Sequence, residues 1–306
     1  MCMVASAAYP ERTIKLVVPF PAGGAADIMA RGLATKLSSE IGQAVVIDNK
    51  GGAGGTTASE VVAKAPADGY TLLFGTMGTH AINPALYQKL RYDSVNDFAP
   101  VSLTHITPRV LIVHSSIPVN SVPELILWAK KNPGTLSYGS AGSGSSSHLS
   151  GALFASLAGI DLLHIPYKGS APLVTDILTG RVNMTFDSFT VYAPHIRSGK
   201  VKALGVTSHD RMTVLPDVPT IIEGGLKSYE VSNWLGVMAP AGTPDAIIKL
   251  LNSALIKSAK SPELRAQLQE LGIEVKTSTP AQFSELIRTD MVKWFEIVKK
   301  SGAKAD

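Results

Sequence analysis

The sequence has 306 residues, of which 45% are hydrophobic and 17% charged, with a formal net charge of +4 and a pI near 9. This composition excludes a disordered chain and favours an α/β protein long enough for two domains. No stretch approaches the ~20 apolar residues of a membrane-spanning helix. The lysines and arginines are scattered and not interleaved with aromatic residues, so nucleic-acid binding is disfavoured and a small anionic ligand fits the charge better.

The chain begins with a short segment, residues 1–8, of small and weakly apolar residues. This segment has the character of the end of an export signal whose basic and hydrophobic parts are missing, and a cloning remnant is the alternative. The single cysteine, Cys2, lies within it. The chain is therefore expected to form neither an internal disulfide nor a cysteine metal site, and we predict no metal and no cofactor.

The N-terminal part alternates strand and helix patterns. Strands are predicted at 14–18, 45–47 and 70–74, and helices between them, up to Ile41 and from Thr56 to Ala65. This alternation is typical of parallel βαβ units.

A second series begins after residues 98–103. It has strand patterns at 110–113, 164–167, 182–186 and 201–206, with helices at 121–132 and 173–178. One more strand, 234–240, precedes two helices that begin at Thr243-Pro244 and Thr279-Pro280, and Trp294 lies on the apolar stripe of the last. We predict an α/β fold of two lobes, each with a doubly wound sheet, joined by two crossings. The first lobe comprises 9–102 plus 233–306, and the second comprises 103–232.

Two glycine-rich turns, one in each half, have the same local pattern. Gly23-Gly24 follows the first predicted strand, and Gly142 to Ser147 follows residues 136–138; a helical pattern comes after each turn. A helix start has unpaired N–H groups and a partial positive charge, and small side chains let an anion approach them. Two such turns facing a cleft between the lobes would hold a carboxylate.

Other motifs are less specific. The loop 51–55 has the same composition, but glycines with positive φ in a tight turn explain it without a ligand. Asp27 either stabilises its helix N-terminus or helps to bind the ligand, and His148 has the same two possible roles. Asp187 follows a predicted strand and lies at its carboxyl end. The sequence contains no dinucleotide fingerprint, phosphate loop, nucleophile elbow or zinc-protease motif, which disfavours the corresponding enzymes.

A series of short motifs, spread over residues 9–302, resembles the Bug/TctC family of periplasmic solute receptors, which serve tripartite tricarboxylate transporters and related uptake or sensing systems. The motifs are 18–24 with Asp27 and Arg31, 49–55, 68–72, 83–84, 97–98, 142–145 with His148-Leu149, 166–172, 215–220 and 239–244. Lys50-Gly51 departs from the arginine and proline usual there, which affects only the local turn. The resemblance implies a periplasmic-binding-protein-like (type II) fold that closes on a small carboxylate.

The resemblance also implies where the ligand lies, between the loops 20–27 and 140–148, mainly on backbone groups and waters. Positions near Thr76 to Thr79, Tyr167 and Asp187 would tune the choice of acid. The predicted ligand-binding residues are Phe20, Ala22, Gly23, Gly24, Asp27, Thr76, Gly78, Ser140, Gly144, Ser145, Ser146, His148 and Asp187.

We therefore expect an exported, periplasmic and monomeric protein that binds no nucleic acid. Its expected role is to deliver a mono-, di- or tricarboxylate, an aromatic acid or an amino acid to the membrane subunits of a transporter. A receptor for a signalling partner is one alternative, and an enzyme on the same fold is another.

Overall fold

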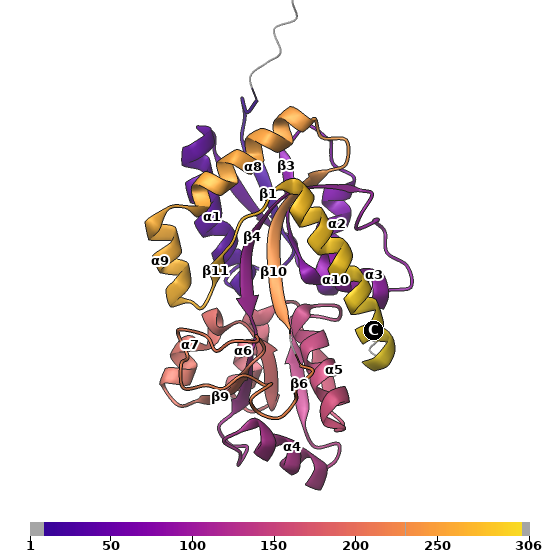
Figure 1. The fold of residues 1–306 in the computed structure, drawn as a ribbon, viewed down its shortest axis with the longest axis vertical. Coiled ribbons are helices and arrows are strands. Elements are labelled where there is room, and N and C mark those ends of the chain that lie inside the picture. Colours follow the sequence, from indigo (N-terminus) through magenta and orange to yellow (C-terminus); the bar gives the residue numbers. More distant parts are fainter. Residues whose placement is uncertain (1–8, 230, 302–306) are drawn as a thin grey trace, which may run out of the picture.

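The structure is a computed structural model in which residues 9–229 and 231–301 are described, and it has two lobes, one above the other in Figure 1. Segment 1–8, with Cys2, which is expected to be the remnant of an export signal or of cloning, lies outside the described residues. Each lobe is built on its own sheet with helices packed against it, which confirms the predicted two-lobe α/β fold.

The first lobe contains a six-stranded sheet with the order β11-β4-β10-β3-β1-β2. Its strands are β1 (Ile14–Val18), β2 (Val45–Asn49), β3 (Thr71–Thr76), β4 (Phe98–Pro108), β10 (Ser232–Pro240) and β11 (Glu274–Val275). β1 runs parallel to β2 and β3, and β10 runs antiparallel to β3 and β4. The carboxyl ends of β1 and β3 therefore lie at the same edge.

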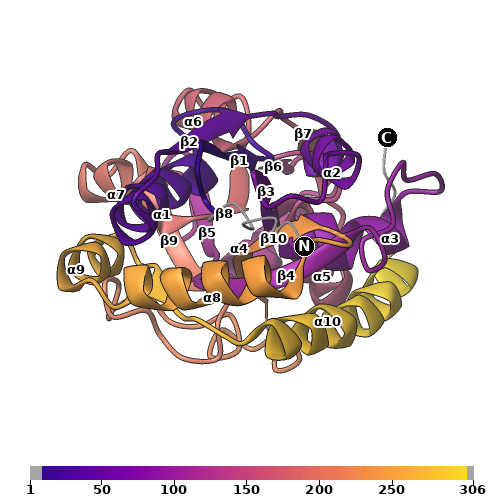
Figure 2. The same ribbon diagram turned by 90° about the horizontal axis from the view of Figure 1, so that it is seen from above.

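The helices of this lobe cover both faces of its sheet. They are α1 (Ala25–Ile41), the short turns η1 (Ala53–Gly55) and η2 (Gly78–Ile82), α2 (Thr56–Ala63), α3 (Asn83–Leu86), α8 (Asp245–Ala259), α9 (Pro262–Glu270) and α10 (Pro280–Ser301). Figure 2 shows α8 and α10 along one side of the molecule. Trp294 of α10 is 1% exposed, as its apolar stripe predicted.

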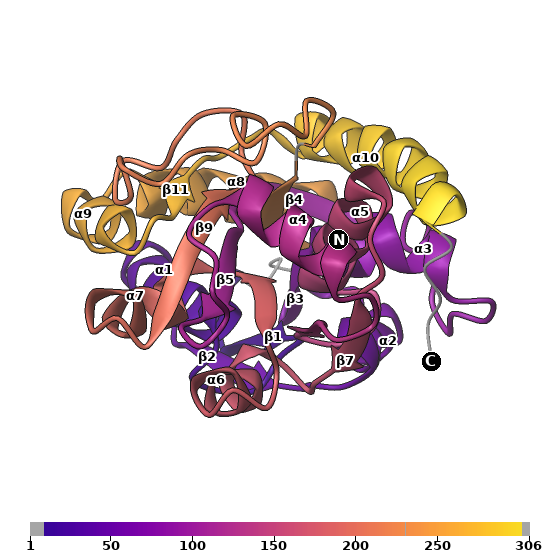
Figure 3. The ribbon, with the colours of Figure 1, turned by 90° about the horizontal axis from the view of Figure 1, so that it is seen from below.

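The second lobe contains a five-stranded sheet with the order β7-β6-β8-β5-β9. Its strands are β5 (Val110–His114), β6 (Ser137–Ser140), β7 (Leu163–Pro166), β8 (Met184–Asp187) and β9 (Val201–Val206). Its helices are α4 (Val122–Lys131), α5 (Ser146–Ala158), α6 (Ser170–Leu178) and α7 (Phe189–Arg197), seen from below in Figure 3. β6 runs parallel to β7 and β8, so the turn before α5 also lies at the carboxyl edge of a sheet.

Helix starts match the capping signals in the sequence. Thr279 Oγ1 accepts a hydrogen bond from the Gln282 N–H at 3.2 Å, and Gln282 Oε1 accepts one from the Thr279 N–H at 3.0 Å. Ser121 Oγ likewise accepts from the Glu124 N–H, and Glu124 Oε2 accepts in return from the Asn120 N–H at 2.7 Å. These reciprocal bonds satisfy donors that a helix start otherwise leaves unpaired, which is why the starts of α4 and α10 were predictable.

The chain crosses between the lobes at β4 and β10. β4 pairs with β10 as far as Pro108, opposite Ser232, and β5 begins in the second sheet at Val110. The division of the chain into lobes at 102/103 and 232/233 stays a prediction. The pairing of β4 with β10 continues beyond residue 102, as far as Pro108, so the first sheet extends toward the second lobe.

The two lobes touch each other beside the cleft. Tyr87 Oη donates to the Ser143 carbonyl at 2.8 Å across the lobes. Gly54 and Gly144 have positive φ, and a Cβ at either position would collide with the opposite lobe, at the Ser143 carbonyl and the Asn83 side chain respectively. The structure is therefore a closed form, and the loop 51–55 is both a tight turn and part of the closing surface.

Candidate functional site

A small cavity of about 30 Å³ lies between the lobes. Both lobes and the crossing strand β10 contribute to its wall, which comprises Phe20, Gly24, Ala25, Ala26, Met29, Thr76, Arg109, Ala141, Ser145, Ser146, Ser170, Asn233 and Leu235. We call it the interlobe cavity. It lies where doubly wound sheets place their ligands, outside the carboxyl ends of the strands.

The start of α1 forms the first-lobe side of this cavity. Gly24 is its N-cap residue and has no side chain to accept from the helix, and Gly24, Ala25 and Ala26 line the wall. The first N–H groups of a helix have no intrahelical partner, so those of α1 are available to a ligand. This end of α1 therefore presents backbone donors and a partial positive charge to the cavity.

The starts of two further helices lie on the second-lobe side. α5 begins after Ser145, whose Oγ accepts from the His148 N–H, and Ser145 and Ser146 line the cavity. α6 begins after Gly169, which offers no side-chain cap, and Ser170 also lines the wall. The sequence predicted the first two helix starts but not the third, although the glycine before Ser170 is a possible signal.

Arg109 follows the last residue of β4 and lies in the wall of the interlobe cavity. Its Nε donates to Ser146 Oγ at 3.1 Å, its Nη2 donates to the same oxygen, and its Nη1 lies 3.3 Å from Asp187 Oδ1. The side chains are 12% and 1% exposed, so the ion pair is buried. Burial raises the pKa of Asp187, opposed by the charge of Arg109.

Asp27 lies behind the glycine turn. Its carboxylate accepts from the Gly23 N–H at 2.9 Å, from Arg31 Nε at 2.9 Å and from Asn49 Nδ2 at 3.0 Å. Burial alone would raise the pKa of Asp27, but the hydrogen bonds from Arg31, Gly23 and Asn49 outweigh it and lower the pKa. An ionised Asp27 therefore holds the turn in place, as a structural role requires.

His148 also lies behind the wall. Its Nδ1 accepts from the Gly144 N–H at 3.2 Å, and its ring stacks on His164 with a centroid distance of 3.9 Å. Burial, and to a lesser extent His164, lowers the pKa of His148 to about 3, so the ring is neutral at physiological pH. The side chain thus shapes the turn before α5.

Five of the predicted site residues line the cavity: Phe20, Gly24, Thr76, Ser145 and Ser146. The others lie outside its wall, namely Ala22, Gly23, Asp27, Gly78, Ser140, Gly144, His148 and Asp187. Their contact with a ligand stays a prediction. Sequence reasoning did not select Asn233 or Ser170, because an isolated polar residue in a strand or at a helix start carries no motif.

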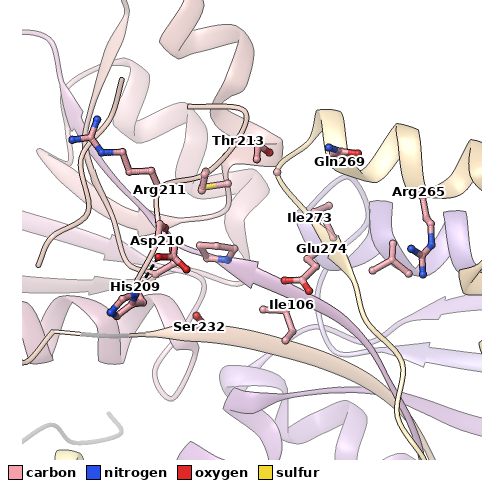
Figure 4. A pocket seen from close by; sticks show the side chains of 15 residues that line it. Ile106, His209, Asp210, Arg211, Thr213, Ser232, Arg265, Gln269, Ile273 and Glu274 are labelled. Carbon is pink, nitrogen blue, oxygen red and sulfur yellow. Dashed lines mark hydrogen bonds and ion pairs between the residues drawn. The ribbon is translucent and has the colours of Figure 1, made fainter. Parts of the chain in front are cut away.

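A larger cavity of about 570 Å³ lies beside the crossing strands. Arg265 and Gln269 of α9 and Glu274 of β11 lie on one side, and His209 and Asp210 of the second lobe lie on the other (Figure 4). Ile106, Pro108 and Ser232 belong to β4 and β10 and line this hinge cavity, whereas Asn233 and Arg109 line the interlobe cavity. Because strand side chains alternate, the two cavities lie on opposite faces of the crossing strands.

The hinge cavity is not the preferred ligand site despite its volume. Its polar side chains on α9 and β11 are exposed, and Arg211 pairs with Glu223 at 2.9 Å. The small interlobe cavity has what anion binding needs, namely several helix starts directed at one enclosed space.

Filling the hinge cavity is expected to oppose opening of the lobes. A rotation of the lobes that opens the interlobe cavity narrows the hinge cavity on the opposite face of the crossing strands. A tryptophan in place of Gln269 would occupy the hinge cavity, so Gln269→Trp should keep the ligand-free protein compact. Small-angle scattering would show a smaller radius of gyration than for Gln267→Trp, a matched control on α9 that does not line the cavity. Equal radii for the two variants would contradict this coupling.

No group of three or more histidine, cysteine, aspartate or glutamate side chains within 9–229 and 231–301 is arranged to hold a metal ion. In that same part of the chain, no helix combines the length and apolar character needed to cross a membrane.

Comparison with known proteins identifies the family. Residues 29–303 match the family model TctC, tripartite tricarboxylate transporter family receptor. Among similar solved structures, Rpa4515 of R. palustris with adipate is 38% identical over 98% of this chain and 100% of that one (TM-score 0.94). The periplasmic binding protein BugD is 38% identical over 97% and 100% (TM-score 0.93). MatC from Rhodopseudomonas palustris with bound malate is 34% identical over 95% and 100% (TM-score 0.91). The chain therefore belongs to the TctC family of tripartite tricarboxylate transporter receptors.

Proposed function

We propose that this protein is a periplasmic receptor that captures a small organic carboxylate in the interlobe cavity and delivers it to the membrane subunits of a tripartite tricarboxylate-type transporter. The observation that carries the proposal is the convergence of α1, α5 and α6 on one enclosed space. Each helix start offers backbone donors and a partial positive charge to an anion.

The electrostatics of the cavity support a carboxylate held mainly by backbone N–H groups, serine hydroxyls and water. The charge of Arg109 is compensated by Asp187, and its Nε, Nη1 and Nη2 groups all donate to protein atoms. The remaining anion-binding capacity is thus on the N–H groups of the helix starts and on the Ser146 hydroxyl, because Ser145 Oγ shares a hydrogen bond with Ser147 Oγ and Ser170 hydrogen-bonds Asp187. These groups are suited to holding an acid unchanged, and with the receptor relatives they favour binding over catalysis.

The ligand class is tested by native mass spectrometry of the purified protein, followed by a thermal-shift screen. The screen would cover mono-, di- and tricarboxylates, amino acids and aromatic acids, including adipate and malate, which bind to the related proteins. An acid at 100 times its Kd should stabilise the fold by ~2.7 kcal/mol. Stabilisation by none of these acids, in protein shown to be free of bound ligand, would contradict the proposal.

Ligand binding is expected to compact the protein by closing the lobes. The predicted hinge segments are 102–105 and 232–234, where β4 and β10 cross. Small-angle scattering of ligand-free protein should show a larger radius of gyration than the protein with saturating acid. An unchanged profile would mean that the cleft is rigid or already closed without ligand.

A further inference from the structure

We propose that Ser146 is the residue with which the second lobe selects an anionic group, and that Arg109 and Asp187 position its hydroxyl hydrogen. This inference rests on the proposed function, since it concerns how the interlobe cavity recognises its acid. It assigns Arg109 a role that its ion pair alone would not reveal.

The argument begins with the hydrogen-bonding capacity of a serine hydroxyl, which has one donor hydrogen and two acceptor lone pairs. Arg109 donates to Ser146 Oγ from both Nε and Nη2. These two bonds use the acceptor capacity of the oxygen. The hydroxyl hydrogen must therefore point away from the guanidinium group.

Within residues 9–229 and 231–301 the Ser146 hydroxyl donates to no protein atom, and Ser146 lines the interlobe cavity. The hydroxyl is consequently available as a donor toward a ligand. Its oxygen is polarised by a cation, which strengthens the donor, and it lies at the positive end of α5.

Arg109 is held firmly enough to fix this direction. Its Nη1 lies 3.3 Å from Asp187 Oδ1, and that oxygen also accepts from the Ser188 N–H at 2.8 Å. The Arg109 main-chain N–H donates to Thr207 Oγ1 at 2.7 Å. Asp187 and Arg109 thus act through Ser146 as positioning residues.

The chemical consequence is a preference for a group that only accepts hydrogen bonds. The starts of α1 and α5 also present donors, so a carboxylate can satisfy several of them at once. A carboxamide of the same shape directs its NH₂ group toward these donors and leaves some unpaired, which is costly in an enclosed site.

The test uses calorimetric titration with the acid found in the screen and with the analogue in which one carboxylate is a carboxamide. Ser146→Ala is expected to weaken acid binding by about tenfold. It should also lower the ratio of the affinity for the acid to the affinity for the carboxamide by a similar factor. Ser146→Thr, which retains a hydroxyl, should restore the ratio. Ser150→Ala, one turn further along α5 and outside the cavity wall, is the matched control and should keep the ratio of the wild type.

A double-mutant cycle tests the positioning role. Ser146→Ala should weaken acid binding about tenfold in the wild-type background. When Arg109→Gln and Asp187→Asn are both present, the same substitution should weaken it only about threefold, because the Ser146 hydroxyl is then already free to rotate. Equal costs in the two backgrounds would overturn the positioning role. A wild-type protein that binds an acid while Ser146→Ala keeps its carboxylate preference would overturn the role of Ser146 and leave the proposed function intact. If the wild type binds no acid, the proposed function itself fails.

Discussion

Replacing Arg109 by glutamine is expected to lower the free energy of unfolding by about 3–5 kcal/mol, because it leaves Asp187 as an uncompensated buried charge. The Asp187 side chain is 1% exposed and that of Arg109 is 12% exposed, so solvent screens the pair little. Denaturant unfolding followed by circular dichroism would measure the loss.

The matched control is the double variant Arg109→Gln/Asp187→Asn, which removes both charges. It should recover most of the lost stability, since a buried pair replaced as a unit costs far less than one partner removed. A single variant as stable as the double variant would show that the pair is not electrostatically coupled.

The same double variant tests how the ligand carboxylate is held. If the helix starts and serine hydroxyls hold it, acid affinity should fall by about threefold, ~0.7 kcal/mol, because only the fixed orientation of the Ser146 hydroxyl is lost. A loss of ~2 kcal/mol or more would instead identify Arg109 as a direct partner of the ligand and contradict the backbone site.

Gly24→Val is expected to weaken acid binding by at least about 100-fold, ~2.7 kcal/mol, while the protein remains folded. Gly24 lines the interlobe cavity at the start of α1, so its new side chain would occupy the space through which an anion reaches the N–H groups. Its φ of −81° is accessible to any residue, and a Cβ there would lie 3.5 Å from the Pro21 carbonyl oxygen, an ordinary contact.

Gly24→Ser provides an informative control for this prediction. A serine at this N-cap position can accept from the N–H groups of α1 with its own hydroxyl, so it should leave stability equal or a few tenths of a kcal/mol higher. It should nevertheless weaken acid binding, because the hydroxyl competes with the ligand for the same donors. Calorimetry paired with denaturant unfolding separates the two effects. Wild-type affinity in both Gly24 variants would remove this turn from the site.

The sequence predicted most of the strands because short apolar runs such as 14–18 and 110–113 are a local pattern typical of buried strands, and these residues are buried in the structure. It also predicted the helices with capping residues, α4 and α10. It missed α7 and α9, although Ser188 and Ser261 cap their starts, and the short helical turns near 78–86, because helices this short carry few turns of a periodic pattern.

For the candidate site, too, the sequence predicted some features and the tertiary structure decided others. Glycine-rich turns at 23–24 and 142–147 mark helix starts through local backbone geometry, so the sequence by itself determined that two helices could offer donors to an anion. The tertiary structure alone decided that α6 joins them, that Asp27 and His148 support the turns from behind, and that Arg109 pairs with Asp187 across 78 residues of chain. Such contacts depend on the relative placement of distant strands and helices, which no local pattern encodes.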